Sequence, residues 1–165
     1  RWLSYEAIRD WLPHRRDVIK TPLASTEGTV IETAVPLLAA PIFPGGLQLW
    51  EGARQVLPSA ELCLGGLPEA IEAQAGVVLL LDQIRQGDEL IELLRRLEQL
   101  GVEAPRLRVI TALTASPGLK QIGETYPEIT IHTACIDADL DEQGRILPGI
   151  GDPLQRLGIR TAQPH

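Results

Sequence analysis

The chain has 165 residues, the length of one ordinary domain, and its 44% of hydrophobic residues is enough to build a single core. Its net charge of −7 at pH 7 argues against nucleic-acid binding, which needs a clustered basic face. The longest apolar run, residues 77–81, is too short to span a bilayer, so no membrane span is predicted.

The amino-terminal half alternates short apolar segments with turn residues. Apolar spacing predicts a short helix over residues 1–11 and a second helix over residues 47–57, which Pro58 ends. Strands are predicted over residues 21–23, 28–30, 35–42 and 60–64. The first two are expected at an edge, and the third is expected to be buried.

The carboxyl-terminal half has the clearer pattern. Residues 77–81 are apolar on both faces, as in the central strand of a parallel sheet. A stripe of leucine and isoleucine predicts a helix over residues 90–100, with Gly101 as its stop. A strand over residues 107–113, a helix over residues 115–124 and a strand over residues 129–136 complete the pattern.

Strands that alternate with helices predict an α/β fold, a mostly parallel sheet with helices on both faces. In such sheets ligands bind outside the carboxyl ends of the strands. The candidate site is therefore expected near residues 42–46, 82–89, 113–118 and 137–152.

Cys63 and Cys135 both lie in apolar, strand-like runs. We interpret them as buried, reduced thiols of a cytoplasmic protein, because two isolated cysteines make a poor metal site and no secretory signal pattern is found. The sequence has no methionine, so we expect either a processed start or native residues before Arg1.

An acidic run and a histidine each have a structural interpretation that requires no ligand. Asp137, Asp139 and Asp141 imitate the start of a calcium loop, but Pro148 stands where the bidentate glutamate is needed. A solvated acidic turn is the better interpretation, and no metal site is predicted. His132, within an apolar strand, is interpreted as a structural histidine with its hydrogen bonds satisfied.

Residues 133–152 read T-A-C-I-D-A-D-L-D-E-Q-G-R-I-L-P-G-I-G-D. This stretch resembles the carboxyl-terminal signature of uracil phosphoribosyltransferases, A-A-I-D-x-x-L-N-E-x-G-Y-I-x-P-G-L-G-D. Residues 3–10 are similar to the family's L-x-Y-E-A-x-R-D, and residues 57–60 match L-P-x-A. The resemblance covers nearly the whole chain. It implies one domain over residues 1–165 with the type I phosphoribosyltransferase fold, in which residues 137–165 form a small hood.

The resemblance also implies where a uracil or UMP ligand would bind. In the family, backbone groups of the hood recognise the uracil edge. The residues implied here are Ile146, Gly149, Gly151 and Asp152 in the hood, with Ile84 and Gln86 after the central strand. Asp152 corresponds to a carboxylate near the ribose and metal.

The positions implied to hold phosphates depart from the family. Pro44 stands where the family has an arginine near the pyrophosphate of phosphoribosyl pyrophosphate, and proline offers neither charge nor donors. The phosphate loop keeps Asp82 and a glycine, Gly87, but Asp88 and Glu89 replace its glycine and hydroxyl residues. Carboxylates suit a bare helix amino terminus but oppose a bound phosphate. The loop is therefore predicted to be degenerate.

A further departure lies at Gly65–Leu67, where the family has a long flexible arm. Two explanations stay open: the arm is deleted, or it lies outside the printed sequence.

These observations lead to three hypotheses. The first is a non-catalytic homologue, a pseudoenzyme with a binding, regulatory or assembly role that keeps a pyrimidine or UMP pocket. The alternative is an active enzyme of pyrimidine salvage that makes UMP from uracil and phosphoribosyl pyrophosphate, with Asp82 and Asp152 as catalytic residues. The third is a structural subunit of a complex. No cofactor is certain; the active enzyme would take Mg²⁺ together with phosphoribosyl pyrophosphate. A homodimer is expected, since the family tends to dimerise, and another protein partner stays open.

Overall fold

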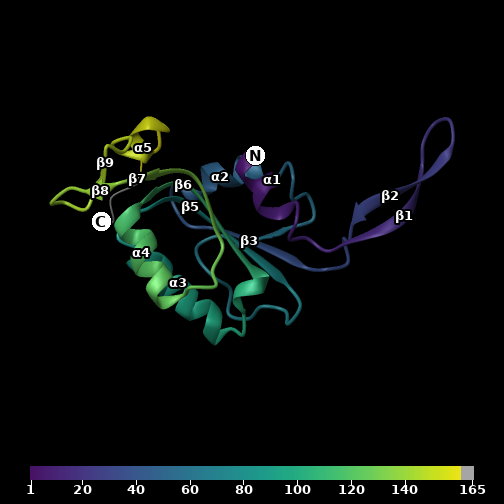
Figure 1. The fold of residues 1–165 in the computed structure, drawn as a ribbon, viewed down its shortest axis with the longest axis horizontal. Coiled ribbons are helices and arrows are strands. Elements are labelled where there is room, and N and C mark those ends of the chain that lie inside the picture. Colours follow the sequence, from purple (N-terminus) through teal and green to yellow (C-terminus); the bar gives the residue numbers. More distant parts are fainter. Residues whose placement is uncertain (161–165) are drawn as a thin grey trace.

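The computed structural model describes residues 1–160 and has a five-stranded parallel sheet at its centre (Figure 1). The strand order is β4-β3-β5-β6-β7, and every neighbouring pair is parallel. The strands are β3 (Leu37–Pro41), β4 (Glu61–Leu62), β5 (Gly76–Ile84), β6 (Leu107–Ala115) and β7 (Ile131–Asp137). The predicted α/β class and the central position of residues 77–81 are confirmed.

Helices cover both faces of this sheet. The elements α1 (Trp2–Ile8) and α2 (Gly46–Ala53) lie on one face, and α3 (Asp88–Gln99) and α4 (Ser116–Thr125) lie on the other (Figure 1). A short 3₁₀ helix, η1 (Ala104–Arg106), precedes β6. The first helix is shorter than predicted because Trp11 leaves it, and its indole nitrogen donates a hydrogen bond to the Pro105 carbonyl oxygen at 2.7 Å.

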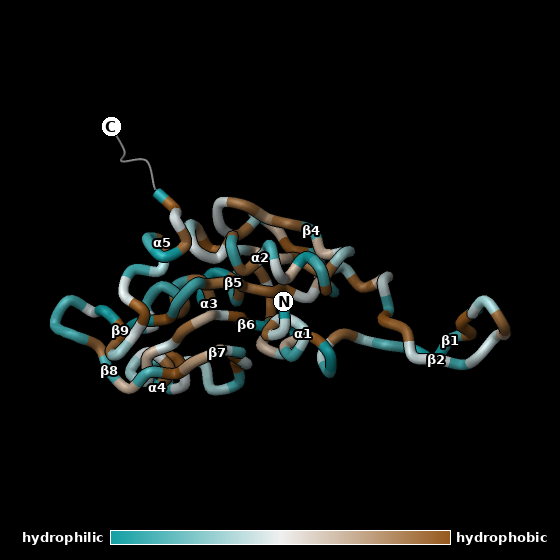
Figure 2. Tube along the Cα trace, turned by 90° about the horizontal axis from the view of Figure 1, so that it is seen from above, coloured by the Kyte–Doolittle hydropathy of each residue, from teal (hydrophilic) through white to brown (hydrophobic). Residues whose placement is uncertain are grey.

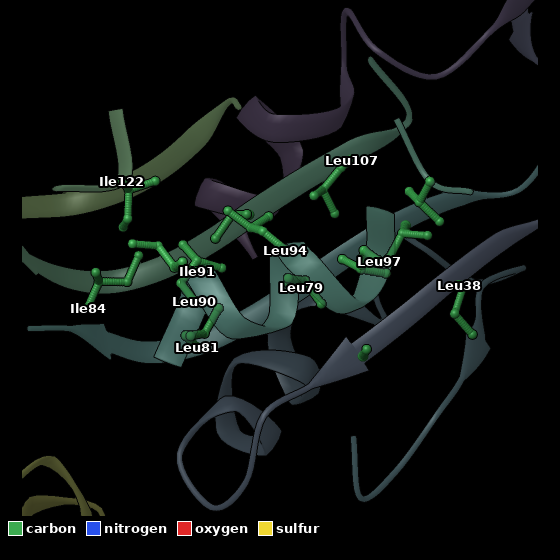
Figure 3. Packing of buried hydrophobic residues seen from close by; sticks show 14 residues of the cluster. Leu38, Leu79, Leu81, Ile84, Leu90, Ile91, Leu94, Leu97, Leu107 and Ile122 are labelled. Atoms are coloured by element: carbon green, nitrogen blue, oxygen red, sulfur yellow. The ribbon is translucent and has the colours of Figure 1, made fainter. Parts of the chain in front are cut away.

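The apolar character of β5 follows from its place between the two helical layers. Leu79 faces the cluster built with α3, whereas Leu80 faces the cluster built with α1 and α2. Successive side chains of a strand point to opposite faces, so both sets must be apolar when both faces are covered. Figure 3 shows Leu90, Leu94 and Leu97 of α3 packed over this sheet.

A separate hairpin projects away from the body (Figures 1 and 2). It consists of β1 (His14–Lys20) and β2 (Ser25–Ile31), paired antiparallel. The prediction of a strand over residues 21–23 was wrong, since these residues form the turn. The Thr21 hydroxyl donates to the Ala24 carbonyl oxygen at 2.7 Å and closes this turn, while Pro22 has no N–H for a ladder.

The hood follows β7 and contains β8 (Asp139–Leu140), β9 (Ile146–Leu147) and α5 (Pro153–Arg156). The pair β8–β9 is antiparallel, and its turn is hydrophilic (Figure 2). Residues 161–165 of the predicted hood lie outside the described residues. No helix within residues 1–160 is long and apolar enough to cross a membrane.

Two expectations about buried side chains need correction. The thiols are free, but Cys63 is only half-buried and Cys135 is exposed, because β7 is the edge strand and its end is uncovered. His132 is not a satisfied histidine: its Nε2 atom is buried without a hydrogen-bond partner within residues 1–160. Burial lowers the pKa of His132, so the ring is neutral at pH 7.

Candidate functional site

The loops that follow β3, β5, β6 and β7 meet at the carboxyl ends of these strands, where the sequence predicted a site. A Cβ atom on Gly45 would clash with the Asp82 carboxyl group, and one on Gly118 would clash with the Arg85 backbone oxygen. These glycines let backbone approach neighbouring loops at a distance that a side chain would prevent.

A cavity of about 410 Å³ lies between the β5–α3 loop and the turn of the hood. This volume is in the range of small-molecule sites. The turn reaches the loop at Gly144, where a Cβ atom would lie 3.6 Å from the Gln86 side-chain nitrogen. The polar residues that line the cavity are Gln83, Arg85, Gln86, Asp88, Glu89, Glu142 and Gln143. A larger cavity, about 650 Å³, lies at the opposite end of the sheet, by the carboxyl ends of α3 and α4.

Asp82 lies near the end of β5 and is half-buried. Its carboxylate accepts a hydrogen bond from the Gln83 backbone N–H at 2.9 Å. Burial raises the pKa of Asp82 above its ordinary value, and the negative charge of Asp152 raises it further, while this hydrogen bond and Arg85 oppose the rise. The two acids predicted as catalytic therefore lie close enough to interact electrostatically.

The head of α3 carries two acidic residues beside the cavity. Gly87 precedes the helix in the left-handed conformation, with φ at 98°, and Asp88 and Glu89 occupy the first turn. The Asp88 carboxylate accepts a hydrogen bond from the Gln121 side-chain amide of α4 at 2.8 Å. The carboxylates thus stand where the helix dipole and the free N–H groups would otherwise attract an anion.

Two aspartates, Asp137 and Asp141, stabilise the backbone of the hood by accepting hydrogen bonds from its N–H groups. The Asp137 carboxylate accepts a hydrogen bond from the Gly149 backbone N–H at 2.9 Å. Asp141 accepts from the backbone N–H groups of Gln143 and Arg145 at 2.9 and 2.8 Å and thereby forms the β8–β9 turn. The backbone hydrogen bond from Arg145 lowers the pKa of Asp141. Of the acidic motif, Asp141 lies in the turn, whereas Asp137 ends β7 and Asp139 lies in β8. No three His, Cys, Asp or Glu side chains gather as a metal site in the described part of the chain.

A family model described as uracil phosphoribosyltransferase matches residues 61–157, more than half of the chain. The chain belongs to the uracil phosphoribosyltransferase family. A uracil phosphoribosyltransferase of Synechococcus elongatus is 37% identical, with 95% of this chain and 80% of the relative covered. One from a Nostoc species is 34% identical over the same shares, and the chloroplastic enzyme of Arabidopsis thaliana is 29% identical. The solved AQ2163 protein of Aquifex aeolicus superposes with a TM-score of 0.78 at 26% identity, covering 94% of this chain.

Membership in the uracil phosphoribosyltransferase family leaves the predicted site residues as predictions, but their places are clear. Asp82 lies near the end of β5, Gln86 lies in the β5–α3 loop, and Asp88 and Glu89 open α3. Ile84 borders the cavity, but its side chain is packed in the core, and only 3% of the residue is exposed. Pro44 is half-buried in the β3–α2 loop, next to the glycine that contacts Asp82.

The hood residues predicted to bind uracil have different surroundings. Ile146 is buried and packs with Leu113 and Ala115 of β6, so only its backbone is available to a ligand. Gly149 has φ at 61° and is held by Asp137. Gly151, with φ at 75°, has open space around its Cα atom. The Asp152 carboxylate caps α5 by accepting from the Leu154 backbone N–H at 2.9 Å.

Glu142 and Gln143 line the cavity, although the sequence interpretation gave them no role. They stand in the turn that reaches the β5–α3 loop, within residues 137–152, where the candidate site is expected from the sequence. The available signal was the position of these residues after the predicted strand over residues 129–136, at the carboxyl end of which ligands are expected to bind.

Proposed function

We propose that the protein binds uracil in the cleft between the β5–α3 loop and the hood, and that its transfer of a phosphoribosyl group to uracil is strongly weakened or lost. Family membership and the ordered hood support uracil binding. The observation that supports weakened transfer is the pair of carboxylates, Asp88 and Glu89, in the first turn of α3 beside the cavity.

The size of the electrostatic effect decides how much weight this observation carries. A phosphate charge about 5 Å from one carboxylate is repelled by about 1 kcal/mol in bulk water and about 3 kcal/mol at an effective dielectric of about 20. Asp88 and Glu89 are exposed, so the lower part of this range applies. Two such contacts still weaken binding by at least about tenfold, and Pro44 supplies no compensating charge.

The alternative is an active uracil phosphoribosyltransferase. The comparisons favour this alternative over a non-catalytic role, because relatives named uracil phosphoribosyltransferase match 95% of the chain at up to 37% identity. Asp82 and Asp152, which interact electrostatically, would be its catalytic residues. Mg²⁺ would then enter together with phosphoribosyl pyrophosphate. A purely structural subunit remains a third hypothesis that no observation favours.

Two measurements on the purified protein test the proposal. Calorimetric titration with uracil should give saturable binding. UMP formation from uracil, phosphoribosyl pyrophosphate and Mg²⁺ should be absent or far below the turnover of about 1–10³ s⁻¹ that is usual for enzymes. Turnover within that range would establish the active enzyme, and absence of uracil binding by a folded sample would leave the structural role.

A charge-restoring variant tests the cause of weakened transfer. Pro44→Arg combined with Asp88→Asn and Glu89→Gln adds one cation and removes two carboxylates. We expect this variant to bind phosphoribosyl pyrophosphate at least tenfold more tightly than the parent protein. The control variant Glu27→Gln with Glu124→Gln removes two exposed carboxylates elsewhere and should leave the affinity for phosphoribosyl pyrophosphate unchanged. If the restored variant folds but gains no affinity, the two carboxylates are not the cause.

A further inference from the structure

The charged side chains around the cavity are unbalanced. Among the described lining residues, three carboxylates (Asp88, Glu89 and Glu142) face one guanidinium, that of Arg85. The carboxylates come from two elements, α3 and the hood turn, so the excess negative charge surrounds the space rather than lying at one point.

Within residues 1–160, Asp88, Glu89 and Glu142 form no salt bridge. Arg145 is the closest basic residue in the hood sequence, but its Nε atom donates to the Asp141 carboxylate at 2.6 Å. Gln121, which binds Asp88, is an uncharged amide. Beyond the loop, Asp82 and Asp152 add two further acidic groups that interact with each other. An anion that enters this cleft therefore meets a negative field from several sides.

The remaining polar groups of the cavity suit a neutral ligand. Gln83, Gln86 and Gln143 bring side-chain amides, each of which both donates and accepts hydrogen bonds. Hydroxyl groups are complementary to amides and to carboxylates, since a hydroxyl can donate to either. A sugar hydroxyl can thus pair with groups that would repel a phosphate.

We propose that this cavity selects an uncharged pyrimidine nucleoside, uridine, over the nucleotide UMP. The inference rests on the proposed function, namely that a uracil-type ligand occupies the cleft, and names the ligand class of that site. A phosphate monoester carries about −1.5 to −2 charges at pH 7. The carboxylates of the cavity therefore repel UMP but not the uncharged uridine.

Calorimetric titrations of the full chain with uracil, uridine and UMP test the inference. Uridine should bind at least tenfold more tightly than UMP at low salt. Raising the ionic strength from about 0.01 M to about 0.15 M shortens the Debye length from about 30 Å to about 8 Å. This change should tighten UMP binding, because it screens repulsion, and leave uridine binding unchanged.

Asp88→Asn with Glu89→Gln should reduce the ratio of uridine affinity to UMP affinity by strengthening UMP binding. The amide oxygens of the new side chains can still accept hydrogen bonds from sugar hydroxyls. The control variant Glu27→Gln with Glu124→Gln, whose changes lie away from the cavity, should bind uridine more tightly than UMP by the same factor as the parent protein. Thermal melting of each variant shows whether the sample is folded, because removing acids from the head of α3 weakens the interaction with the helix dipole.

Equal or tighter binding of UMP at low salt would overturn the inference while leaving uracil binding, and thus the proposed function, in place. An unchanged preference in the folded Asp88→Asn, Glu89→Gln variant would also overturn it, because the carboxylates would not be its cause. Failure of all three ligands to bind a folded sample would overturn the proposed function itself and the inference with it.

Discussion

At the scale of single residues, Asp82 illustrates a conflict between stability and ligand binding. Its carboxyl group is half-buried at the end of β5, against Gly45. Burial raises the pKa of Asp82, and nearby Asp152 raises it further. The ionised form is therefore less favourable in the folded protein than in the unfolded chain, which is common at functional sites.

The replacement Asp82→Asn should raise the melting temperature at pH 7. Asparagine keeps the acceptor for the Gln83 N–H but removes the charge. Because the folded pKa is raised, the stabilising contribution of the protonated acid is present below the unfolded pKa and is lost as pH rises through the folded pKa. Solvent screening of a half-exposed group keeps the gain below about 1 kcal/mol, or about 2–4 °C.

Melting curves of Asp82→Asn and the parent protein from pH 3 to pH 8 check this sign. The two proteins should converge below about pH 4, where the carboxyl is protonated in both states. A variant that melts below the parent at pH 7 would show that the negative charge stabilises the fold.

Asp137 is the residue that we expect to position the hood. Its carboxylate accepts from the Gly149 N–H, so Asp137→Ala should remove one charge-assisted hydrogen bond worth about 1.5–3 kcal/mol locally. Uracil affinity should fall by about tenfold or more, and the Gly149 amide should exchange faster with solvent. Asp139→Ala, an exposed neighbour in β8, is the control. Equal affinities of both variants would place Asp137 outside the binding machinery.

At the scale of elements, the cavity depends on how closely α4 approaches the β5–α3 loop. Gly118 in the first turn of α4 lies against the backbone of Arg85 and Gln86. Gly123, one and a half turns later, has open space around its Cα atom. The same residue type therefore has a packing role at one position of the helix and none at the other.

Gly118→Ala and Gly123→Ala should have opposite effects. The methyl group at residue 118 would push α4 away from the loop, so stability should fall by about 1–3 kcal/mol and uracil affinity should fall with it. At residue 123 alanine should raise stability by about 0.5–1 kcal/mol, because glycine is the poorer helix former. Urea denaturation of both variants measures this contrast, and a stable Gly118→Ala protein would show that the loop adapts.

At the scale of the whole molecule, the main feature is the β1–β2 hairpin, which projects from the body (Figure 2). Its exposed apolar side chains include Val18 at 62% and Leu23 at 97% exposure. The expected homodimer stays a prediction. Covering such side chains would release water from apolar surface, which favours association.

Sedimentation equilibrium over micromolar concentrations should give twice the monomer mass. Leu23→Asp should shift the balance toward monomer if the hairpin takes part, and Thr26→Asp, at another exposed hairpin position, is the control. A single species of monomer mass across the whole range would contradict the dimer.

Sequence patterns predicted the elements whose burial is uniform. The strand β5 is buried on both faces between two helical layers, and α3 carries a stripe of leucine, so the type and the approximate position of both elements were predicted correctly. Sequence patterns failed to predict the turn of the β1–β2 hairpin and the exposure of Cys135. A turn closed by a threonine hydroxyl and an exposed strand edge both depend on neighbours that apolar spacing does not reveal.

By itself the sequence determined the family, the α/β class and the acidic replacement of the phosphate loop, because these follow from residue identity and order. Only the tertiary structure decided which side chains surround the cavity. Glu142 and Gln143 are more than fifty positions from the β5–α3 loop, and the hood turn brings them there. The charge of a site is a sum over groups that are close in space, so the order of residues cannot reveal it before the chain folds.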